Sequence, residues 1–384
     1  MLYFDYAANC PVDEDVLELF YQTTKKYYAN PNATHALGVE VKNKIDDATS
    51  RIAKALHVFP EEIVYTSGAT EANNLAIKGT AKRYKGIGKH IIVSTLEHTS
   101  VIASCSSLQE EGFDIDVLPV LPNGLVSLEE LKKLLREDTI LVSICSVDSE
   151  LGVRQPIEEI ADLLKHYPNV HFHSDATHAI GKINIDYSDV DLVTISPHKF
   201  YGLTGIGFLI KKRTTDVRPI INGGRSTTVY RSGTPEVGSI CAACLALEKA
   251  LEHQEERLNY VKKLYITVLE HFQKNPLVHI NNVASSIPYT LNLSILGMKS
   301  NMFVKKLEEK GIIVSAKTSC CPIDSPSKLV YALTRDKKLA ATSLRISFSH
   351  LTTEEEVQQL LIIFDQCIKE ELYDKTNSKT SSGD

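Results

Sequence analysis

A lysine, Lys199, follows directly on a predicted strand that ends near residue 196. A lysine at the inner end of a buried strand costs free energy unless its amine is paired or chemically used. A desolvated amine of this kind forms Schiff bases with aldehydes. One strand earlier, Asp175 also stands at a strand end, where it can cap the following helix or serve chemistry. The two residues together suit covalent chemistry on an aldehyde.

A third strand ends just before Gly68, and a helix begins there with Ala69 and Thr70. Backbone N–H groups and a hydroxyl at a helix N-terminus form a cradle for phosphate, although every strand-to-helix turn needs small residues. Ser196 and His198, beside the lysine, can reach the same phosphate. An amine for an aldehyde, a carboxylate for a pyridine nitrogen and a phosphate cradle suit pyridoxal phosphate. We therefore expect this cofactor.

Two further groups stand towards the C-terminal side. Cys320 and Cys321 precede Pro322, in a stretch whose prolines and small polar residues predict an exposed loop with reactive thiols. Arg345 stands in an otherwise apolar strand, where its guanidinium needs a planar anionic partner. A substrate carboxylate is the natural partner, and an ordinary buried ion pair is the alternative.

The elements that must position these groups alternate between short apolar strands and amphipathic helices. This alternation predicts an α/β fold with a mostly parallel seven-stranded sheet that helices cover on both faces. In such sheets ligands bind at the carboxyl ends of the strands, which is where the groups above stand. One predicted helix has apolar residues at 41, 45, 48, 52 and 56. The predicted strands cover residues 63–66, 90–94, 114–120, 140–147, 170–175, 192–196 and 206–211.

The length of 384 residues suggests two domains, at about 150 residues for each. We predict a large cofactor-binding domain over residues 15–249 and a smaller α+β domain from residues 1–14 and 250–372, which carries the cysteine loop. From residue 375 onward the chain is polar and free of aromatic residues, which predicts a disordered tail over residues 373–384. The smaller domain contains a long predicted helix over 258–272 and strands at 290–295, 313–316 and 343–349.

Composition narrows the class of protein. Hydrophobic residues make up 43% of the chain, the net charge is -6, and Lys and Arg form no long block. This excludes a nucleic-acid binder that works by bulk electrostatics. No apolar run reaches about 18 residues, so we predict no membrane span.

The eight cysteines are predicted to be reduced, because the chain begins without a basic and apolar leader. Cys241 and Cys244 form a C-x-x-C pattern inside an Ala-rich stretch typical of a helix. No second pair of ligands is placed to complete a zinc site, so we predict buried packing there and no metal site. A cytoplasmic location follows as the default.

Taken together, these motifs resemble those of the cysteine desulfurases in the class V aminotransferase group, which share the type I pyridoxal-phosphate transferase fold. The resemblance extends from Phe4 to about Glu371 and rests on the order and spacing of several short motifs. These motifs are Asp5-Tyr6-Ala7-Ala8, Asn30-Pro31 with His35, residues 66–75, Glu97-His98, Asp175, His198-Lys199, Arg231-Ser232-Gly233-Thr234 and Arg345.

For the cofactor ring, the resemblance implies that Lys199 holds the aldehyde and later moves protons. Asp175 would face the pyridine nitrogen, and His98 would stack on the ring and act as acid and base. His178 stands where the family has a glutamine that donates to the phenolic oxygen, and an imidazole N–H can do the same. Ser149 replaces an asparagine that helps to orient the cofactor and the substrate carboxylate.

For the phosphate and the substrate, the resemblance implies two sets of ligands. Arg345, with Ser149, would bind the substrate carboxylate. One phosphate ligand would come from the second subunit of a homodimer. The phosphate ligands implied are Ala69, Thr70, Ser196, His198 and, from the other subunit, Thr234.

Cys320 stands at the position of the family's nucleophile, which takes sulfur from L-cysteine as a persulfide and releases alanine. Two departures leave the loop geometry open. Residues 317–319 are Lys-Thr-Ser instead of Gly-Ser-Ala, and Cys321 follows the nucleophile directly. Neighbouring side chains on an extended loop point to opposite sides, and a residue before proline favours extended backbone. We therefore assign the nucleophile to Cys320 and regard Cys321 as a bystander or a relay.

The function implied is that of a pyridoxal-phosphate-dependent cysteine desulfurase for iron–sulfur cluster assembly or tRNA thiolation. Its partners would be L-cysteine, a second copy of the chain, and a sulfur-acceptor protein, either an iron–sulfur scaffold or a tRNA-thiolation enzyme. Direct contact with nucleic acid or membrane is not expected. The alternatives are a selenocysteine lyase or aminotransferase of the same class, and a divergent cofactor-binding partner protein with weak activity. Cys320 favours the desulfurase because an aminotransferase needs no such thiol, whereas Ser149 and His178 keep the last alternative open.

Overall fold

The computed structural model describes residues 1–224, 226–317 and 325–380, and these form two compact units. Unit 1 comprises Met1–Ala8, Glu150–Gly152 and Glu256–Asp384, and unit 2 comprises Asn9–Ser149 and Val153–Glu255. In this division residues 9–14 and 250–255 belong to unit 2. The predicted division into two domains with separate roles stays a prediction. None of the helices in the described ranges is long and apolar enough to cross a membrane.

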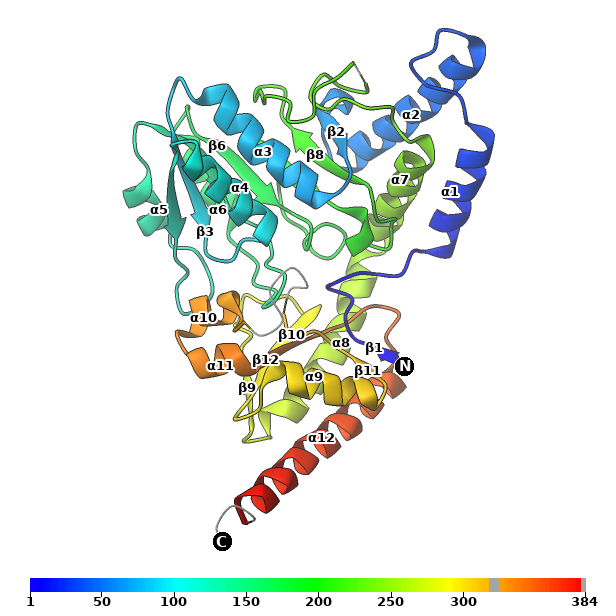
Figure 1. Cartoon of the computed structure of the whole chain (residues 1–384). Coiled ribbons are helices and arrows are strands. Elements are labelled where there is room, and N and C mark those ends of the chain that lie inside the picture. Colours follow the sequence, from blue (N-terminus) through cyan, green and yellow to red (C-terminus); the bar gives the residue numbers. More distant parts are fainter. Residues whose placement is uncertain (225, 318–324, 381–384) are drawn as a thin grey trace. The chain divides into compact units, whose positions relative to one another are not determined.

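Unit 2 is built on a seven-stranded sheet with the strand order β2-β8-β7-β6-β5-β3-β4. The strands from β7 to β4 pair in parallel, and β8 runs antiparallel to both of its neighbours. Because helices cover both faces, β2, β3, β5 and β7 are buried along their whole length (Figure 1). The predicted seven-stranded, mostly parallel sheet is therefore confirmed. The strands are β2 (Ile63–Thr66), β3 (His90–Ser94), β4 (Asp114–Leu118), β5 (Thr139–Ser143), β6 (His171–Asp175), β7 (Leu192–Ile195) and β8 (Gly207–Lys211).

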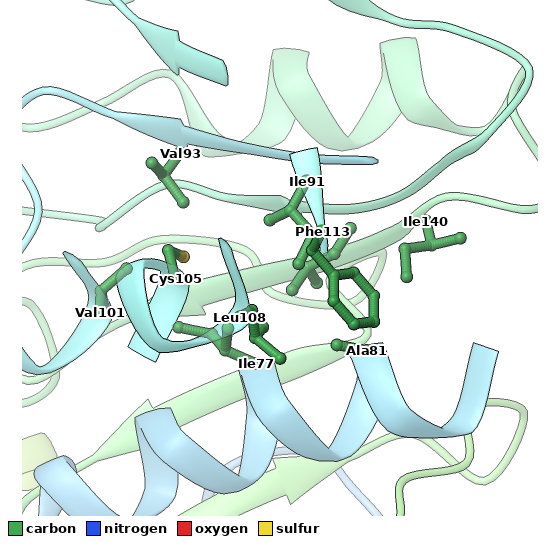
Figure 2. Close-up of a cluster of buried hydrophobic side chains, with 10 residues drawn as sticks. Ile77, Ala81, Ile91, Val93, Val101, Cys105, Leu108, Phe113 and Ile140 are labelled. Carbon is green, nitrogen blue, oxygen red and sulfur yellow. The ribbon is translucent and has the colours of Figure 1, made fainter. Parts of the chain in front are cut away.

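Helices α3 and α4 of unit 2 each bury an apolar stripe against this sheet, whereas α1 and α2 pack mainly against α7. Ile77 and Ala81 lie one turn apart on α3, and Val101 and Cys105 lie one turn apart on α4. These side chains pack against buried residues of the strands, as Figure 2 shows. Each such burial contributes roughly 1.5–3 kcal/mol for a large aliphatic side chain. The helices are α1 (Glu14–Lys26), α2 (Ala36–Ala55), α3 (Ala69–Tyr84), α4 (Thr99–Glu110), α5 (Leu128–Leu134), α6 (Ile157–Leu164) and α7 (Val237–Glu252).

Cys241 and Cys244 are buried on α7, as predicted. Both lie on a helix whose inner face consists of small and aliphatic residues. Burial raises the pKa of both thiols, which keeps them protonated at neutral pH. The two cysteines therefore act as packing residues in this structure.

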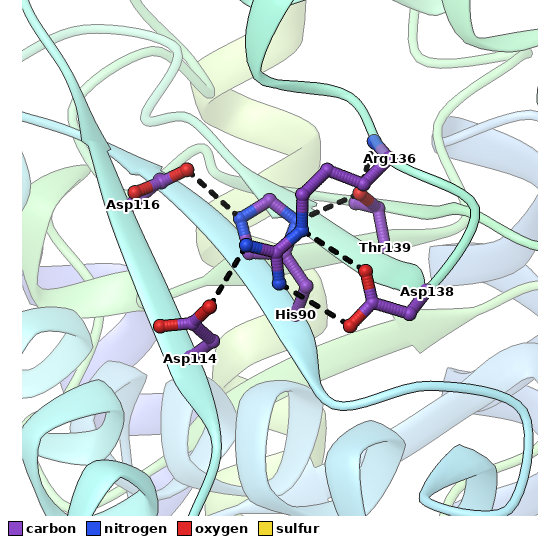
Figure 3. Close-up of polar contacts among 6 residues, drawn as sticks. All are labelled: His90, Asp114, Asp116, Arg136, Asp138 and Thr139. Carbon is purple, nitrogen blue, oxygen red and sulfur yellow. Dashed lines mark hydrogen bonds and ion pairs between the residues drawn. The ribbon is translucent and has the colours of Figure 1, made fainter.

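A polar cluster fixes the starting edge of three parallel strands. His90 at the start of β3 is fully buried, and its Nδ1 lies 2.7 Å from Oγ1 of Thr139 at the start of β5. Its Nε2 lies 3.1 Å from Oδ2 of Asp116 on β4. Arg136 pairs with Asp114 at the start of β4, at 2.8 Å, and so joins the same edge (Figure 3). This cluster aligns the strands at the edge opposite to the one where they end.

Unit 1 combines a small antiparallel sheet, in the order β12-β10-β9, with a parallel pair of β1 and β11. The predicted strands at 290–295 and 343–349 correspond to β10 and β12. The strands are β1 (Leu2–Tyr3), β9 (Val278–Ile280), β10 (Thr290–Ile295), β11 (Ile312–Ile313) and β12 (Ser343–Ser347). The helices are α8 (Gln254–Gln273), α9 (Ser300–Glu309), α10 (Lys328–Thr334), α11 (Lys337–Thr342) and α12 (Glu354–Thr380).

The long helix α12 closes the described part of unit 1 and extends over Glu354–Thr380. The disordered tail predicted for residues 373–384 overlaps the end of this helix and continues beyond the described residues. It stays a prediction.

Candidate functional site

The carboxyl ends of five strands meet at one edge of the sheet in unit 2. Thr66, the last residue of β2, pairs with Gly207, and Ile195, the last residue of β7, pairs with Phe208. The strands β2 and β7 therefore end side by side across the start of β8. Since β6, β5 and β3 run parallel to β7, they end at the same edge (Figure 1). The chain segments that follow these five strands carry most of the predicted site residues.

The turn after β2 forms an anion cradle. Gly68 caps α3 without a side chain and has φ +147°, a conformation that glycine adopts without strain. A Cβ atom at Gly207 would lie 2.7 Å from Cα of Gly68, so this close approach requires a glycine at position 207. Among the described residues, no side chain caps the N-terminus of α3, Ala69 is half-buried and Thr70 is exposed beside it. The positive end of α3 thus presents N–H groups and a hydroxyl that suit a phosphate.

The segment after β7 holds Lys199 in a single tight turn. Pro197–Lys199 forms a 3-10 turn, and Oγ of the buried Ser196 lies 2.8 Å from Nδ1 of His198. Burial and the charges of two lysines, Lys199 and Lys182, lower the pKa of His198 to about 4. His198 is therefore neutral at pH 7 and can donate or accept a hydrogen bond at this turn.

Cys10 holds the same turn from the N-terminal side. Its backbone N–H donates to the carbonyl oxygen of His198 at 3.1 Å, and its buried thiol donates to that of Lys199 at 3.4 Å. Burial raises the pKa of this thiol, so it remains a neutral donor. The backbone carbonyl groups of His198 and Lys199 are thereby held by two hydrogen bonds from Cys10.

Asp175 ends β6 and is buried, with a donor on each carboxylate oxygen. Oδ1 accepts the backbone N–H of Thr177 at 3.0 Å, and Oδ2 accepts Nδ2 of Asn73 at 2.8 Å. His178 lies half-buried in the turn that follows. The carboxylate is thus held in one orientation at the sheet edge, as a partner for a protonated ring nitrogen must be.

His98 begins α4 after β3, where it caps the helix. Its Nδ1 accepts the backbone N–H of Ser100 at 3.1 Å and lies 2.8 Å from Oγ of the same residue. Burial lowers the pKa of His98, the Asp175 carboxylate raises it, and Lys199 lowers it further. The net shift is downward, so the imidazole is neutral at pH 7.

Asn73 and Ser100 also lie at this site, and neither of them has a role in the predictions made from the sequence. Nδ2 of Asn73 donates to Oγ of Ser100 at 2.9 Å as well as to Asp175. A usable signal was present, because Asn73 precedes Ile77 by one helical turn and so lies on the buried stripe of α3. A fully buried amide on such a stripe needs polar partners.

For the remaining predicted residues of unit 2, the structure shows the location and the burial. Ser149 is buried in the turn beyond β5, at the end of the first of the two chain segments that form unit 2. Thr234 is exposed, and the nearby Arg231 pairs with Glu71 of α3 at 2.9 Å. The contact of Thr234 with a second subunit stays a prediction. The two predicted loop thiols, Cys320 and Cys321, lie outside the described residues.

Arg345 belongs to unit 1 and is the middle residue of strand β12. Its side chain is 1% exposed, and Nη2 lies 2.8 Å from Oδ1 of Asp5. The sequence left open whether this arginine serves a substrate or an ion pair, and the structure contains an ion pair. A role towards a substrate carboxylate stays a prediction.

The chemistry of these groups fits pyridoxal phosphate. The cradle at the start of α3, with Ser196 and His198, offers donors for a phosphate. The buried Asp175 offers a fixed carboxylate for a ring nitrogen, and Lys199 offers an amine for an aldehyde. All of them follow strands that end at one edge of one sheet.

Comparisons with known proteins agree with this chemistry. The family model described as aminotransferase class-V matches residues 2–360. The chain is 36% identical to the cysteine desulfurase IscS of Dictyoglomus turgidum over 375 residues, which cover 96% of this chain and 94% of that protein. It is 38% identical to the mitochondrial cysteine desulfurase of Arabidopsis thaliana over 366 residues, with 93% and 80% covered. A solved structure titled NifS-like protein matches with a TM-score of 0.90 at 33% identity, covering 96% of this chain and 99% of the other. The last likeness confirms the fold expected from the sequence.

Proposed function

The chain belongs to the class V aminotransferase family and is a cysteine desulfurase, and from this premise we propose how its own residues carry out the reaction. The substrate is L-cysteine, and the products are L-alanine and a persulfide on the chain. The thiolate of Cys320 attacks the substrate sulfur, and the bond between that sulfur and the substrate carbon breaks. The electron pair of the broken bond stays with the carbon, which takes up a proton to give alanine.

Enzymes of this family use pyridoxal phosphate, which when bound supplies an electron sink for the substrate carbons. In the proposed assignment Lys199 holds the cofactor, Asp175 keeps its ring nitrogen protonated, and His98 stacks on the ring. His178 donates to the phenolic oxygen, and Ser149 helps to orient the ring and the substrate. The phosphate is held by Ala69, Thr70, Ser196 and His198, with Thr234 of a second subunit.

The single observation that carries this assignment is the convergence of strand ends in unit 2. Asp175 ends β6, Lys199 and His98 follow β7 and β3, and the three strands end at one edge. The pKa of His98 is lowered, so a neutral imidazole is available as a base at pH 7. Lys199 lies close enough to affect the pKa of His98, which supports a shared site for proton transfer.

The finer assignments rest on the resemblance of the motifs and on the charge balance. Arg345 binds the carboxylate of L-cysteine, and the active unit is a homodimer. The sulfur passes to an acceptor protein, either an iron–sulfur scaffold or a tRNA-thiolation enzyme. The six cysteines among the described residues are not joined by disulfide bonds, which supports a reducing compartment such as the cytoplasm.

The test of the function is product formation from L-cysteine by the purified chain with pyridoxal phosphate. Alanine and, with a reductant, sulfide are expected in equal amounts, and Lys199→Ala is expected to abolish both. The visible absorption band of the bound cofactor should vanish in that variant. A Lys199→Ala protein that keeps this band after borohydride treatment and dialysis would contradict the assignment of the lysine.

The test of the nucleophile separates the two adjacent thiols. After L-cysteine is added, an alkylating probe traps the persulfide, and mass spectrometry maps it. We expect label on Cys320, loss of turnover in Cys320→Ser, and near-normal turnover in the matched variant Cys321→Ser. Label on Cys321 in a Cys320→Ser protein that still turns over would reverse the assignment.

A further inference from the structure

Four side chains form one hydrogen-bonded chain inside unit 2. Oδ2 of Asp175 accepts from Nδ2 of Asn73 at 2.8 Å, and the same nitrogen donates to Oγ of Ser100 at 2.9 Å. Oγ of Ser100 lies 2.8 Å from Nδ1 of His98. The two ends of this chain are the residues assigned above to the cofactor ring, and its two middle members have no assigned role.

The direction of each hydrogen bond follows from the chemistry of the groups. An ionised carboxylate only accepts, so the atom of Asn73 that faces Asp175 must be the amide nitrogen. The second hydrogen of that nitrogen goes to Ser100, whose oxygen is therefore an acceptor on this side. The hydroxyl proton of Ser100 is then left for Nδ1 of His98. All hydrogens along the chain point away from Asn73.

A second donor agrees with this direction. The backbone N–H of Ser100 also donates to Nδ1 of His98, at 3.1 Å. A ring nitrogen that accepts from two donors carries no proton of its own. The proton of the neutral imidazole therefore sits on Nε2. Protonation of Nδ1 would have to displace both donors.

The amide of Asn73 is held in place at a cost. Its Oδ1 is buried and has no hydrogen-bond partner among the residues that the structure describes. An acceptor left in this way loses its hydration without compensation. A leucine of similar size on the buried stripe of α3 would leave no such atom. Stability alone therefore does not account for an asparagine at this position, whereas the polarity of the chain does.

We propose that Asn73 and Ser100 are positioning residues for the desulfurase reaction, which fix His98 as the tautomer with its proton on Nε2 and tie its orientation to that of Asp175. The proposal deepens the proposed function and rests on it. It implies that the pair sets the pH at which His98 takes up a second proton. Among the described residues, the charges of Asp175 and Lys199 also act on His98.

The experiment observes His98 directly in the full chain without pyridoxal phosphate. Two-bond ¹⁵N–¹H spectra of histidine-labelled protein report which ring nitrogen carries the proton, and His98→Gln assigns the signal. The wild-type ring should show only the Nε2–H form. Ser100→Ala removes one donor, so the titration midpoint of His98 should rise by roughly 0.5–1 pH unit. The Nδ1–H form should become detectable in this variant.

The isosteric change Asn73→Asp reverses the bond to Ser100, because the new carboxyl oxygen accepts its hydroxyl proton. The same oxygen lies beside Oδ2 of Asp175, so the two carboxyl groups share one proton there. We expect a midpoint increase at least as large as that in Ser100→Ala. Asn74→Asp is the matched control, since it adds the same charge one residue further along α3. The amide of Asn74 donates only to the carbonyl oxygen of Thr70, at 2.9 Å. The control should shift the midpoint by less than half as much as Asn73→Asp.

Two outcomes overturn the proposal. The first is a wild-type tautomer and midpoint in both Ser100→Ala and Asn73→Asp, with Ser100→Ala deciding if the other variant fails to fold. The second appears in the loaded enzyme, where the acidic limb of the pH profile of kcat should move in Ser100→Ala in the same direction as the His98 midpoint. An unmoved limb removes the role in the reaction. Absence of desulfurase activity in the wild-type protein would instead refute the proposed function, and the spectra would still decide the tautomer.

Discussion

Nη2 of Arg345 lies 2.8 Å from Oδ1 of Asp5, so the guanidinium assigned to the substrate carboxylate already neutralises a carboxylate of its own unit. The arginine is 1% exposed and the aspartate 14%, which makes the pair a desolvated one. A buried charge without a partner is strongly destabilising. Asp5 therefore stabilises Arg345 in the free chain, and a substrate carboxylate that binds to Arg345 as proposed would share or replace this contact.

Asp5→Asn should lower the stability of the free chain and increase its response to ligand. The amide keeps the shape of the side chain but removes the negative charge, at a cost of roughly 1–3 kcal/mol. L-Alanine, the product, brings a carboxylate and should raise the melting temperature more in this variant than in the wild type. Asp13→Asn is the control, because it breaks the pair with Lys249, 2.6 Å away in unit 2. An equal ligand response in all three proteins would contradict the prediction.

Arg345→Ala should weaken the binding of L-cysteine by tenfold or more. A charged hydrogen bond contributes roughly 1.5–3 kcal/mol, and the substitution removes it from the substrate. Arg345→Lys should restore little, because an ammonium cannot reproduce the planar fork of the guanidinium. Binding is measured by titrating the absorption change of the bound cofactor. Wild-type affinity in the alanine variant would refute the assigned role.

The Glu97 carboxyl should make the wild-type chain less stable as pH rises, and Glu97→Gln should remove this pH dependence. Oε1 of Glu97 accepts from Ser94 at 2.6 Å and from the backbone N–H of Cys145 at 2.7 Å, and burial raises the pKa of this carboxyl to about 8. The folded chain thus keeps a proton that the unfolded chain loses near its ordinary value of 4.5. Between these two values the folded state binds more protons, so its stability falls as pH rises.

The size of this effect approaches about 1.4 kcal/mol for each pH unit in that window. Urea unfolding of the wild type and of Glu97→Gln at pH 5, 6, 7 and 8 measures it. The difference in free energy of unfolding should shift steadily in favour of the variant towards pH 8. Two parallel pH curves would show that the carboxyl is ionised in the folded chain.

Substitutions of Glu71 and Arg231 should have non-additive effects on the rate at which the chain loses its cofactor. Arg231 donates to both oxygens of Glu71, at 2.9 and 3.4 Å, and Glu71 accepts the backbone N–H of Ser67 at 2.8 Å. The pair therefore joins the cradle at the start of α3 to the segment that carries Thr234. Glu71→Gln and Arg231→Gln should each speed the loss of cofactor on dilution, and the double variant should lose little more than either one.

The control for this pair is Arg83→Gln. It breaks a pair with Asp216 at 2.6 Å on the surface, where both side chains are more than a third exposed. Exposed pairs contribute about 0–1 kcal/mol, so cofactor loss should stay near the wild-type rate. Strictly additive losses in Glu71→Gln and Arg231→Gln would contradict the coupling.

The strands and their end residues could be predicted because the signal is local. Short runs such as 63–66 and 90–94 are buried on both faces, and burial on both faces leaves a continuous apolar pattern in the sequence. Lys199 and Asp175 then stand out as polar residues at the ends of such runs. The local apolar pattern therefore predicted the strands of the sheet. The rule that ligands bind at the carboxyl ends of the strands predicted the edge at which the site lies.

The contacts that the sequence did not predict join residues far apart in the chain. Asn73 and Asp175 are 102 positions apart, and Asp5 and Arg345 are 340 apart. No local periodicity reports which polar side chain meets which, because that depends on the strand order. The same holds for Cys10, whose contact with Lys199 follows only from the path of the chain before α1.

The pairing of β1 with β11 has a consequence for the order of folding. Leu2 pairs with Ile312 and Tyr3 with Ile313, and the whole of unit 2 lies between these partners in the chain. Closing so long a loop has an entropic cost that the intervening contacts must reduce first, and contacts of high sequence separation form slowly. During synthesis the earliest strand therefore waits for its partner while unit 2 assembles. Refolding experiments should find protection of the amides of β1 and β11 from hydrogen exchange among the last to appear.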